Sequence, residues 1–260
     1  MSDLQQWTTA SELARQIAAK EVSSREVLDA MIAAADHVDE ATNAVVWRMH
    51  DAARRDAEQA DQAVAAGDEL GPLHGVPVSI KECYRVADTP ATWGLVSRRS
   101  LRDVDEGPLV SRLRASGAIP FVKTNVPVLL MENETHNPLY GRTTNPWNVD
   151  RSPGGSSGGE AALIAGGGSP LGLGGDIGGS LRIPAHVTGI ATLKATTRRL
   201  PDTDRPRGFP PSSNEIQSVD GPMARSVADV ALGYEVLRTP APGEVTDPRI
   251  NPAPPDDEPR

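Results

Sequence analysis

The most informative stretch of this sequence is RSPGGSSGGEAALIAGGGSPLGLGGDIGGSLR, which covers residues 151–182. Twelve of its 32 residues are glycine, but two apolar runs, residues 161–165 and 171–173, separate the glycines. A flexible linker lacks such runs. Glycines between apolar residues are typical of places where the main chain passes close to other main chain or to a ligand. The stretch is therefore predicted to be structured and to carry the functional site.

Two familiar kinds of glycine-rich site fit this stretch poorly. A phosphate-binding loop ends in Gly-Lys-Ser/Thr, and residues 151–182 contain no lysine. A dinucleotide-binding turn needs glycines at positions i, i+2 and i+5, and the glycine pairs that begin at Gly166 and Gly172 lack the third member. The sequence Gly-Gly-Ser-Ser-Gly at residues 154–158 matches the nucleophile elbow, but a loop-like segment precedes it and His186 follows it too closely. Nucleotide binding and an α/β-hydrolase site are both disfavoured.

A serine nucleophile with a lysine base fits the residues better. Lys81 follows the apolar run 76–80, where burial would lower the pKa of the ammonium and let the neutral amine take a proton from a serine. Residues 177–180, Ile-Gly-Gly-Ser, supply consecutive amides with little side-chain bulk around them, which can converge on one oxyanion. The serine that attacks would be the last residue of that run.

The surrounding sequence alternates helices with short strands and predicts a layered α/β architecture with parallel strand pairs. Two helices are expected to begin at the capping residues Ser11 and Ser23, the second with Glu26 at capping-box spacing. Pro77 marks the first residue of a strand or an edge strand. Further helices are expected over residues 51–66, 109–115 and 226–236, and strands over residues 44–48, 76–80 and 118–122.

Composition narrows the class of protein. The chain has 260 residues, of which 38% are hydrophobic, so it can form a sizeable core. Its formal net charge of −9 argues against a nucleic-acid partner. The single cysteine, Cys83, excludes a disulfide framework and is interpreted as a packing thiol, and the five histidines show no metal-ligand spacing. No secretory signal or membrane span is expected, which predicts a cytoplasmic protein.

One domain is expected over residues 1–238, with N-terminal helices in residues 1–70 and a catalytic core in residues 71–238. Residues 239–260 contain seven prolines and five acidic residues. A segment of that composition buries too little apolar surface to fold alone. Residues 239–260 are therefore predicted to form a disordered acidic tail.

The spacing of several motifs resembles that of the amidase signature family of Ser-cisSer-Lys amidohydrolases. The residues that carry the resemblance are GVPVSIK at 75–81, KTNVP at 123–127, NP at 137–138, GRTTNPW at 141–147, nearly all of 151–184, 189–194 and DGPMARS at 220–226. The resemblance implies an α/β fold with a mixed, largely parallel sheet covered by helices, of which the C-terminal part is missing. Family members generally run well beyond 400 residues, which implies a chain truncated after the N-terminal half.

The resemblance also implies a role for individual residues. Ser180 would be the nucleophile that forms the acyl-enzyme, Ser156 the bridging serine behind a cis peptide bond, and Lys81 the base. The oxyanion hole would consist of the amides of Ile177, Gly178, Gly179 and Ser180. Orienting groups around it would be Ser157, Asp176 and Arg182. No metal and no organic cofactor is implied.

The chain departs from the family at two positions near these residues. Glu82 stands where the family usually has aspartate, and its longer side chain is expected to shift a neighbouring contact. Gly175 stands where the family commonly has threonine or serine, which removes a hydroxyl near the oxyanion loop. Neither departure touches the triad.

The expected reaction is hydrolysis of linear carboxamides to a carboxylate and ammonia or an amine. Two alternatives stay open: a glutaminase-type subunit of a tRNA-dependent amidotransferase, and a truncated, inactive amidase-like module. The expected partner is a small-molecule amide substrate, without nucleic acid or a membrane span. A homodimer and a complementing C-terminal half are both open at this point.

Overall fold

The computed structural model describes residues 7–201 and 218–245. Its main sheet contains six strands in the order β1-β3-β2-β6-β8-β7. The strands of this sheet are β1 (Val45–Arg48), β2 (Pro77–Lys81), β3 (Ile119–Thr124), β6 (Leu171–Asp176), β7 (Ala191–Thr192) and β8 (Val219–Ala224). A separate two-stranded ribbon pairs β4 (His136–Asn137) with β5 (Gly141–Arg142).

The sheet is mixed, with its parallel pairs at the centre. Strand β2 pairs in parallel with β3 on one side and β6 on the other, whereas β1–β3, β6–β8 and β7–β8 are antiparallel. Strands β2, β3, β6 and β7 consequently run in one direction and β1 and β8 in the other. The expectation of a mixed, largely parallel sheet is confirmed. Pro77 begins β2 as expected, but β2 is a central strand and not an edge.

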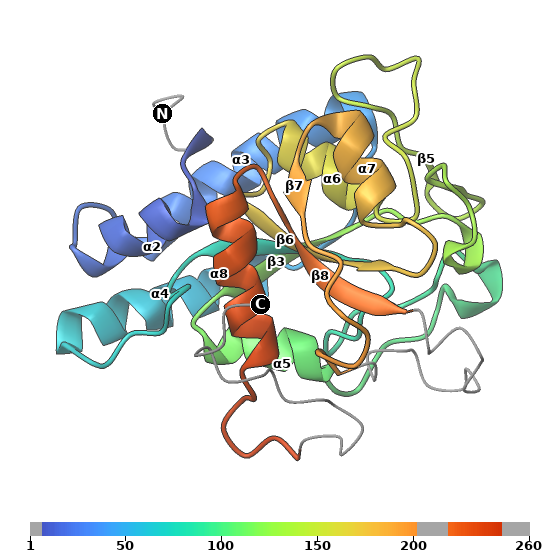
Figure 1. Ribbon diagram of the computed structural model, residues 1–260. Helices are drawn as coiled ribbons and strands as arrows, with labels where there is room; N and C mark the ends of the chain where they lie inside the picture. Colours follow the sequence, from blue (N-terminus) through green and yellow to red (C-terminus); the bar gives the residue numbers. More distant parts are fainter. Residues whose placement is uncertain (1–6, 202–217, 246–260) are drawn as a thin grey trace, which may run out of the picture.

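Helices cover the sheet, as Figure 1 shows, with α3, α6 and α7 gathered together and α5 and α8 packed on other parts of the sheet. Helix α6 contacts β2, β3, β6 and β8, and α8 contacts β6, β7 and β8. The helices are α2 (Ala10–Ala18), α3 (Ser24–Thr42), α4 (His50–Ala66), α5 (Pro108–Ala115), α6 (Gly158–Ala165), α7 (Arg182–Thr188) and α8 (Val227–Arg238), with the short 3₁₀ turns η1 (Val96–Arg98) and η2 (Val128–Leu130). The layered α/β prediction is confirmed.

Local sequence signals account for some of the helix ends. The capping box at Ser23 and Glu26 is present, and the Ser226 side chain caps α8. The expected cap at Ser11 is wrong, because Thr9 caps α2 and the Ser11 hydroxyl instead donates to Asp229 of α8 at 2.8 Å. Serine and threonine are both favoured at helix N-caps, and here the contact with α8 engages the Ser11 hydroxyl.

The glycine-rich stretch is densely packed. Every residue of α6 is buried, and a Cβ at Gly159 would overlap the main chain of Asn125. A Cβ at Gly172 of β6 would overlap the Glu160 carboxylate, which α6 places against the sheet. The small residues let α6 approach the central strands closely. This close approach positions the residues that precede α6 next to the end of β2.

Residues 239–245, at the start of the predicted tail, lie in the described part of the chain. There the Glu244 carboxylate forms an ion pair with the buried Arg112 guanidinium of α5 at 2.6 Å. Arg112 also donates to the carbonyl oxygen of Leu237 at the end of α8. Residues 246–260 lie outside the described residues, so disorder there stays a prediction.

Candidate active site

Lys81 is the last residue of β2, and its side chain is buried at 1% relative exposure. Its Nζ atom lies 2.8 Å from Ser156 Oγ and 2.8 Å from Ser157 Oγ. A third contact, 3.5 Å long, runs from Nζ to the carbonyl oxygen of Gly175 in β6. The structure therefore brings a lysine together with two serines that lie 75 and 76 residues further along the sequence.

Burial lowers the pKa of the Lys81 ammonium, whereas the nearby Cys83, Asp220, Asp176 and Glu160 act in the opposite direction. Removing the charged form from water favours the neutral amine. A neutral amine next to a hydroxyl can accept its proton. The surroundings of Lys81 thus suit a general base.

The two serines precede α6, and the Gly155–Ser156 peptide bond is cis, as the family resemblance implies. The resemblance implies that Ser157 only orients other groups, but its hydroxyl lies as close to Lys81 Nζ as the Ser156 hydroxyl does. The backbone N–H of Ser157 also donates to the carbonyl oxygen of Ser180 at 3.2 Å. This bond places the Ser180 main chain beside the two serines.

Ser180 ends the loop that follows β6, and it is half-buried. Helix α7 begins at Arg182, with Leu181 at its cap position. Within the part of the chain that the structure describes, no hydrogen bond joins the Ser180 hydroxyl to Ser156. The meeting of these two hydroxyls in the working site stays a prediction.

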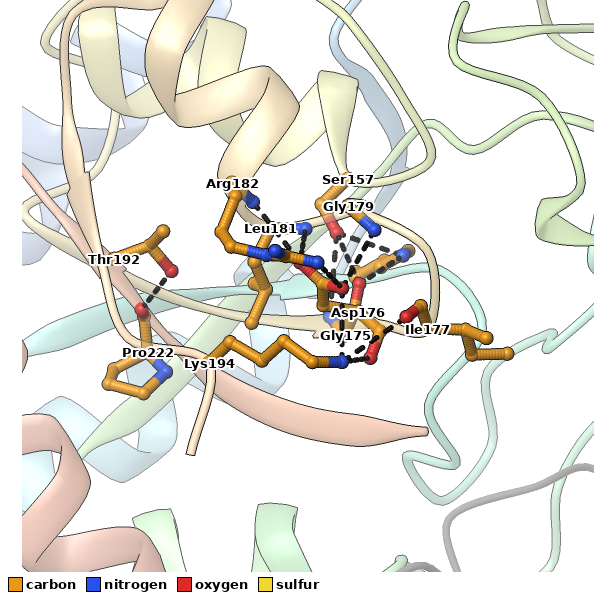
Figure 2. A network of polar contacts seen from close by, with 11 residues as sticks. Ser157, Gly175, Asp176, Ile177, Gly179, Leu181, Arg182, Thr192, Lys194 and Pro222 are labelled. Carbon is orange, nitrogen blue, oxygen red and sulfur yellow. Dashed lines mark hydrogen bonds and ion pairs between the residues drawn. The ribbon is translucent and has the colours of Figure 1, made fainter. Parts of the chain in front are cut away.

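Asp176 organises the loop between β6 and α7. Its buried carboxylate accepts the backbone N–H groups of Gly179 at 2.8 Å and Leu181 at 3.1 Å, and it pairs with Arg182 Nε at 3.0 Å. Burial alone would raise the pKa of Asp176, but hydrogen bonds from Arg182, from these two amides and from Lys194 hold it well below its usual range. Figure 2 shows these contacts, and the orienting role of Asp176 and Arg182 stays a prediction.

The same contacts change the set of oxyanion donors. The resemblance implies that the Gly179 N–H is an oxyanion donor. In the structure this N–H instead donates to the Asp176 carboxylate. The amides of Ile177, Gly178 and Ser180 find no acceptor among residues 7–201 and 218–245. These three remain the candidate donors.

Sequence reasoning gave no role to Lys194, which reaches this loop from beyond β7. Its Nζ donates to the carbonyl oxygen of Asp176 at 2.7 Å and to that of Ile177 at 3.3 Å. Contacts of a side chain with main-chain oxygens leave no pattern of residue types in a sequence. The single sequence feature that included Lys194 is the segment 189–194, which shares in the family resemblance.

The two departures from the family pattern have visible surroundings. The Glu82 carboxylate is buried and accepts the backbone N–H groups of Thr92 at 2.6 Å and Trp93 at 3.0 Å, so it holds the next loop rather than contacting Lys81. At Gly175 a Cβ would lie 2.8 Å from Asp220 Oδ1 and 2.9 Å from the Tyr84 hydroxyl. Polar atoms of Asp220 and Tyr84 therefore lie where a side chain at position 175 would begin.

Cys83 lies two residues after Lys81 and is buried. Burial raises the pKa of the Cys83 thiol to about 12, which keeps it neutral and agrees with a packing role.

Within residues 7–201 and 218–245, no cluster of three or more His, Cys, Asp or Glu side chains could hold a metal ion. Along the same stretches, no helix combines the length and apolar character that crossing a lipid bilayer requires.

Comparison with known proteins identifies the family. The profile described as Amidase matches residues 26–260. This chain belongs to the amidase signature family. The structure of a bacterial aryl acylamidase of this family superposes with a TM-score of 0.84 at 32% identity, covering 94% of this chain and 49% of that one.

Curated members of the amidase signature family show the same relation. Fatty-acid amide hydrolase 1 of Sus scrofa is 40% identical over 226 residues, which is 87% of this chain and 38% of the relative. A glutamyl-tRNA(Gln) amidotransferase subunit of Mycolicibacterium paratuberculosis is 39% identical over 229 residues, which is 88% of this chain and 45% of the relative. The chain thus spans about half the length of the relatives that it matches.

Proposed function

We propose that this chain carries the catalytic centre of an amidohydrolase that cleaves linear carboxamides to a carboxylate and ammonia or an amine. One observation carries the proposal above the others. The buried Lys81 amine contacts the Ser156 hydroxyl at 2.8 Å, beside the loop that contains Ser180 and the amides of Ile177 and Gly178, which find no acceptor among the described residues. Membership of the amidase signature family supports the same reaction class.

Acylation would begin when Ser180 Oγ attacks the amide carbonyl carbon. As the Oγ–C bond forms, the electron pair of the carbonyl π bond moves to oxygen, and the proton of Ser180 passes to Ser156 while Ser156 gives its own proton to Lys81. The amides of Ile177 and Gly178 would stabilise the resulting oxyanion. The proton on Lys81 then returns through Ser156 to the leaving nitrogen as the C–N bond breaks.

Deacylation would repeat these steps with water. A water molecule attacks the acyl carbon, its proton passes through Ser156 to Lys81, and the Ser180 Oγ leaves with the returned proton as the carboxylic acid is released. Because serine is a weak nucleophile at its ordinary pKa, it needs a base, and the lowered pKa of Lys81 increases the share of neutral amine that can accept the proton. The proposal keeps the prediction of a cytoplasmic enzyme that needs no cofactor.

The relatives favour a second function of the same site. Similarity to an amidotransferase component allows a glutaminase role, in which this site would release ammonia for a partner protein. The half-length match to its relatives allows a third outcome, a module without activity of its own. A homodimer or a complementing C-terminal half would then complete the site.

A fluorophosphonate probe tests the proposal directly, because serine attack displaces fluoride and leaves a stable phosphonyl adduct. We expect the folded wild-type chain to be labelled, Ser180→Ala to be unlabelled, and turnover of a simple aryl amide to fall by roughly 10⁴-fold in that variant. The matched control is Ser100→Ala, which removes an exposed serine and should label like wild type.

Each outcome of this experiment has a distinct meaning. Labelling that survives in Ser180→Ala would overturn the assignment of the nucleophile. A monodisperse wild-type chain that stays unlabelled would favour the inactive module. Glutamine hydrolysis that appears only after partner proteins are added would favour the amidotransferase role.

A further inference from the structure

The oxyanion loop, residues 177–181 between β6 and α7, is held by a second residue besides Asp176. That residue is Lys194, which comes from the edge of the sheet. Lys194 follows β7, an edge strand, and its Nζ reaches back to the end of β6. There it contacts the carbonyl oxygens of Asp176 at 2.7 Å and Ile177 at 3.3 Å, and Asp176 Oδ1 at 3.2 Å. Figure 2 shows this ammonium against Asp176 and Ile177, with the Arg182 guanidinium on the Asp176 carboxylate.

The two carbonyl oxygens belong to consecutive peptide units, 176–177 and 177–178. Both units are trans, since Gly155–Ser156 is the single cis bond found in the described residues. In a trans peptide unit the N–H points away from the C=O. An ammonium that holds these two oxygens therefore directs the N–H groups of Ile177 and Gly178 to the opposite side. Those are two of the three amides that find no acceptor among the described residues.

The loop needs such support because its own sequence provides little stiffness. A Cβ at Gly178 would meet no atom within 4 Å, and Gly179 has a φ of 126°, a conformation that favours glycine. The Asp176 carboxylate accepts the N–H groups of Gly179 and Leu181. It does not accept those of Ile177 and Gly178. The side chain of Arg182 binds the carboxylate of Asp176 and not the carbonyl oxygens that Lys194 holds. The peptide units 176–177 and 177–178 are thus held by Lys194.

We propose that Lys194 is a positioning residue that pre-orients the Ile177 and Gly178 amides toward the oxyanion. This inference rests on the proposed amidohydrolase function. Lys194 acts on the reacting atoms only through these two peptide units. Donors that are oriented before the reaction cost no reorganisation when charge develops on the carbonyl oxygen. Loss of the tether should therefore weaken binding of the transition state more than binding of the substrate.

The test replaces the ammonium while keeping a similar side-chain length. For Lys194→Met we expect kcat on an acyl p-nitroanilide to fall by roughly 10- to 100-fold, with KM within about threefold of wild type. Lys194→Arg retains a cation with several donors and should recover part of the loss. The matched control is Lys20→Met, which removes an exposed lysine and should leave both constants unchanged.

A second measurement separates positioning from a general effect on folding. Active sites are counted by fluorophosphonate titration, so that kcat is expressed per reactive serine. A trifluoromethyl ketone, which forms a tetrahedral adduct with the nucleophilic serine, should bind Lys194→Met more weakly by about the factor lost in kcat/KM. If Lys194→Met does not fold, Lys194→Gln provides the same measurements with a neutral side chain.

The outcomes distinguish this inference from the function on which it rests. Unchanged kcat per reactive serine and unchanged ketone affinity in Lys194→Met would overturn the positioning role and leave the amidohydrolase intact. A rise in KM without loss of kcat would also overturn it. A wild-type chain whose Ser180 neither reacts with the probe nor supports turnover would overturn both.

Discussion

Lys81 and Lys123 are buried lysines on the neighbouring parallel strands β2 and β3, and they differ in what surrounds the amine. Lys123 pairs with Ile80, the residue before Lys81, so the two side chains leave the sheet on opposite faces. Lys81 contacts two serine hydroxyls. Lys123 donates to the carbonyl oxygens of Tyr84 and Pro90 and to the Thr89 hydroxyl.

The comparison shows that burial alone does not make a lysine a base. Burial lowers the pKa of both lysines, that of Lys123 to about 8, so Lys123 is still largely protonated at neutral pH. Carbonyl oxygens accept hydrogen bonds but cannot pass a proton onward, and the Thr89 hydroxyl beside Lys123 donates to the carbonyl oxygen of Val86, whereas the serine hydroxyls beside Lys81 both donate and accept. The partners of Lys123 suit a structural cation, and the partners of Lys81 suit a proton relay.

The largest effect is expected at the relay. Lys81→Met should reduce kcat/KM by roughly 10⁴-fold, because among the described residues no other base contacts Ser156. The free energy of unfolding should fall by about 1–2 kcal/mol, because the Ser156 hydroxyl loses its lysine partner while Ser157 keeps the Gly175 backbone as a partner. Steady-state kinetics and urea unfolding measure the two quantities. Retained turnover would remove Lys81 from the mechanism and with it the contrast between the lysines.

The reverse result is expected on the opposite face. Lys123→Met leaves the carbonyl oxygens of Tyr84 and Pro90 buried without their donor, which should lower the free energy of unfolding by about 2–4 kcal/mol. Turnover per reactive serine should stay within about threefold of wild type. Urea unfolding with fluorophosphonate titration checks both, with Lys20→Met as the control. A large loss of kcat without loss of stability would show that Lys123 also takes part in the reaction.

The smallest effect is a dependence on pH. Lys81 must be neutral to accept a proton, so kcat/KM should fall about tenfold for each pH unit below the pKa of Lys81. Burial lowers that pKa, which places the midpoint below the usual 10.5 of a lysine. Lys123→Met should show the same midpoint, because Lys123 lies on the other face of the sheet. A midpoint that moves with Lys123, or a flat profile, would contradict the assignment of Lys81.

Sequence alone predicted the parts of the site that depend on residue type. Lys81 at the end of an apolar run could be proposed as a base because burial favours the neutral amine, whereas the place of Ser156 in the relay came only from the resemblance to the amidase signature family. The helix ends at Ser23 and Ser226 followed from local capping chemistry. Local signals of this kind act over a few residues and leave a pattern in the chain.

The parts that sequence missed depend on main-chain contacts between distant segments. Lys194 binds carbonyl oxygens, and Gly179 donates its amide to Asp176, so neither contact could be recognised from side-chain identity. The insertion of β8 between β6 and β7 is a property of the topology. Ser157 and Ser156 reach Lys81 equally because of the turn that they share.

The dense packing around Gly159 and Gly172 has a consequence for how this site can vary. Even a methyl group at either position would overlap its neighbours, the Asn125 main chain and the Glu160 carboxylate. Enlarging a side chain there would push α6 away from the sheet and carry the two serines away from Lys81. New substrate preferences are therefore expected to arise from exposed side chains at the rim, such as Ile177, and the glycine-rich stretch should resist change in laboratory selection.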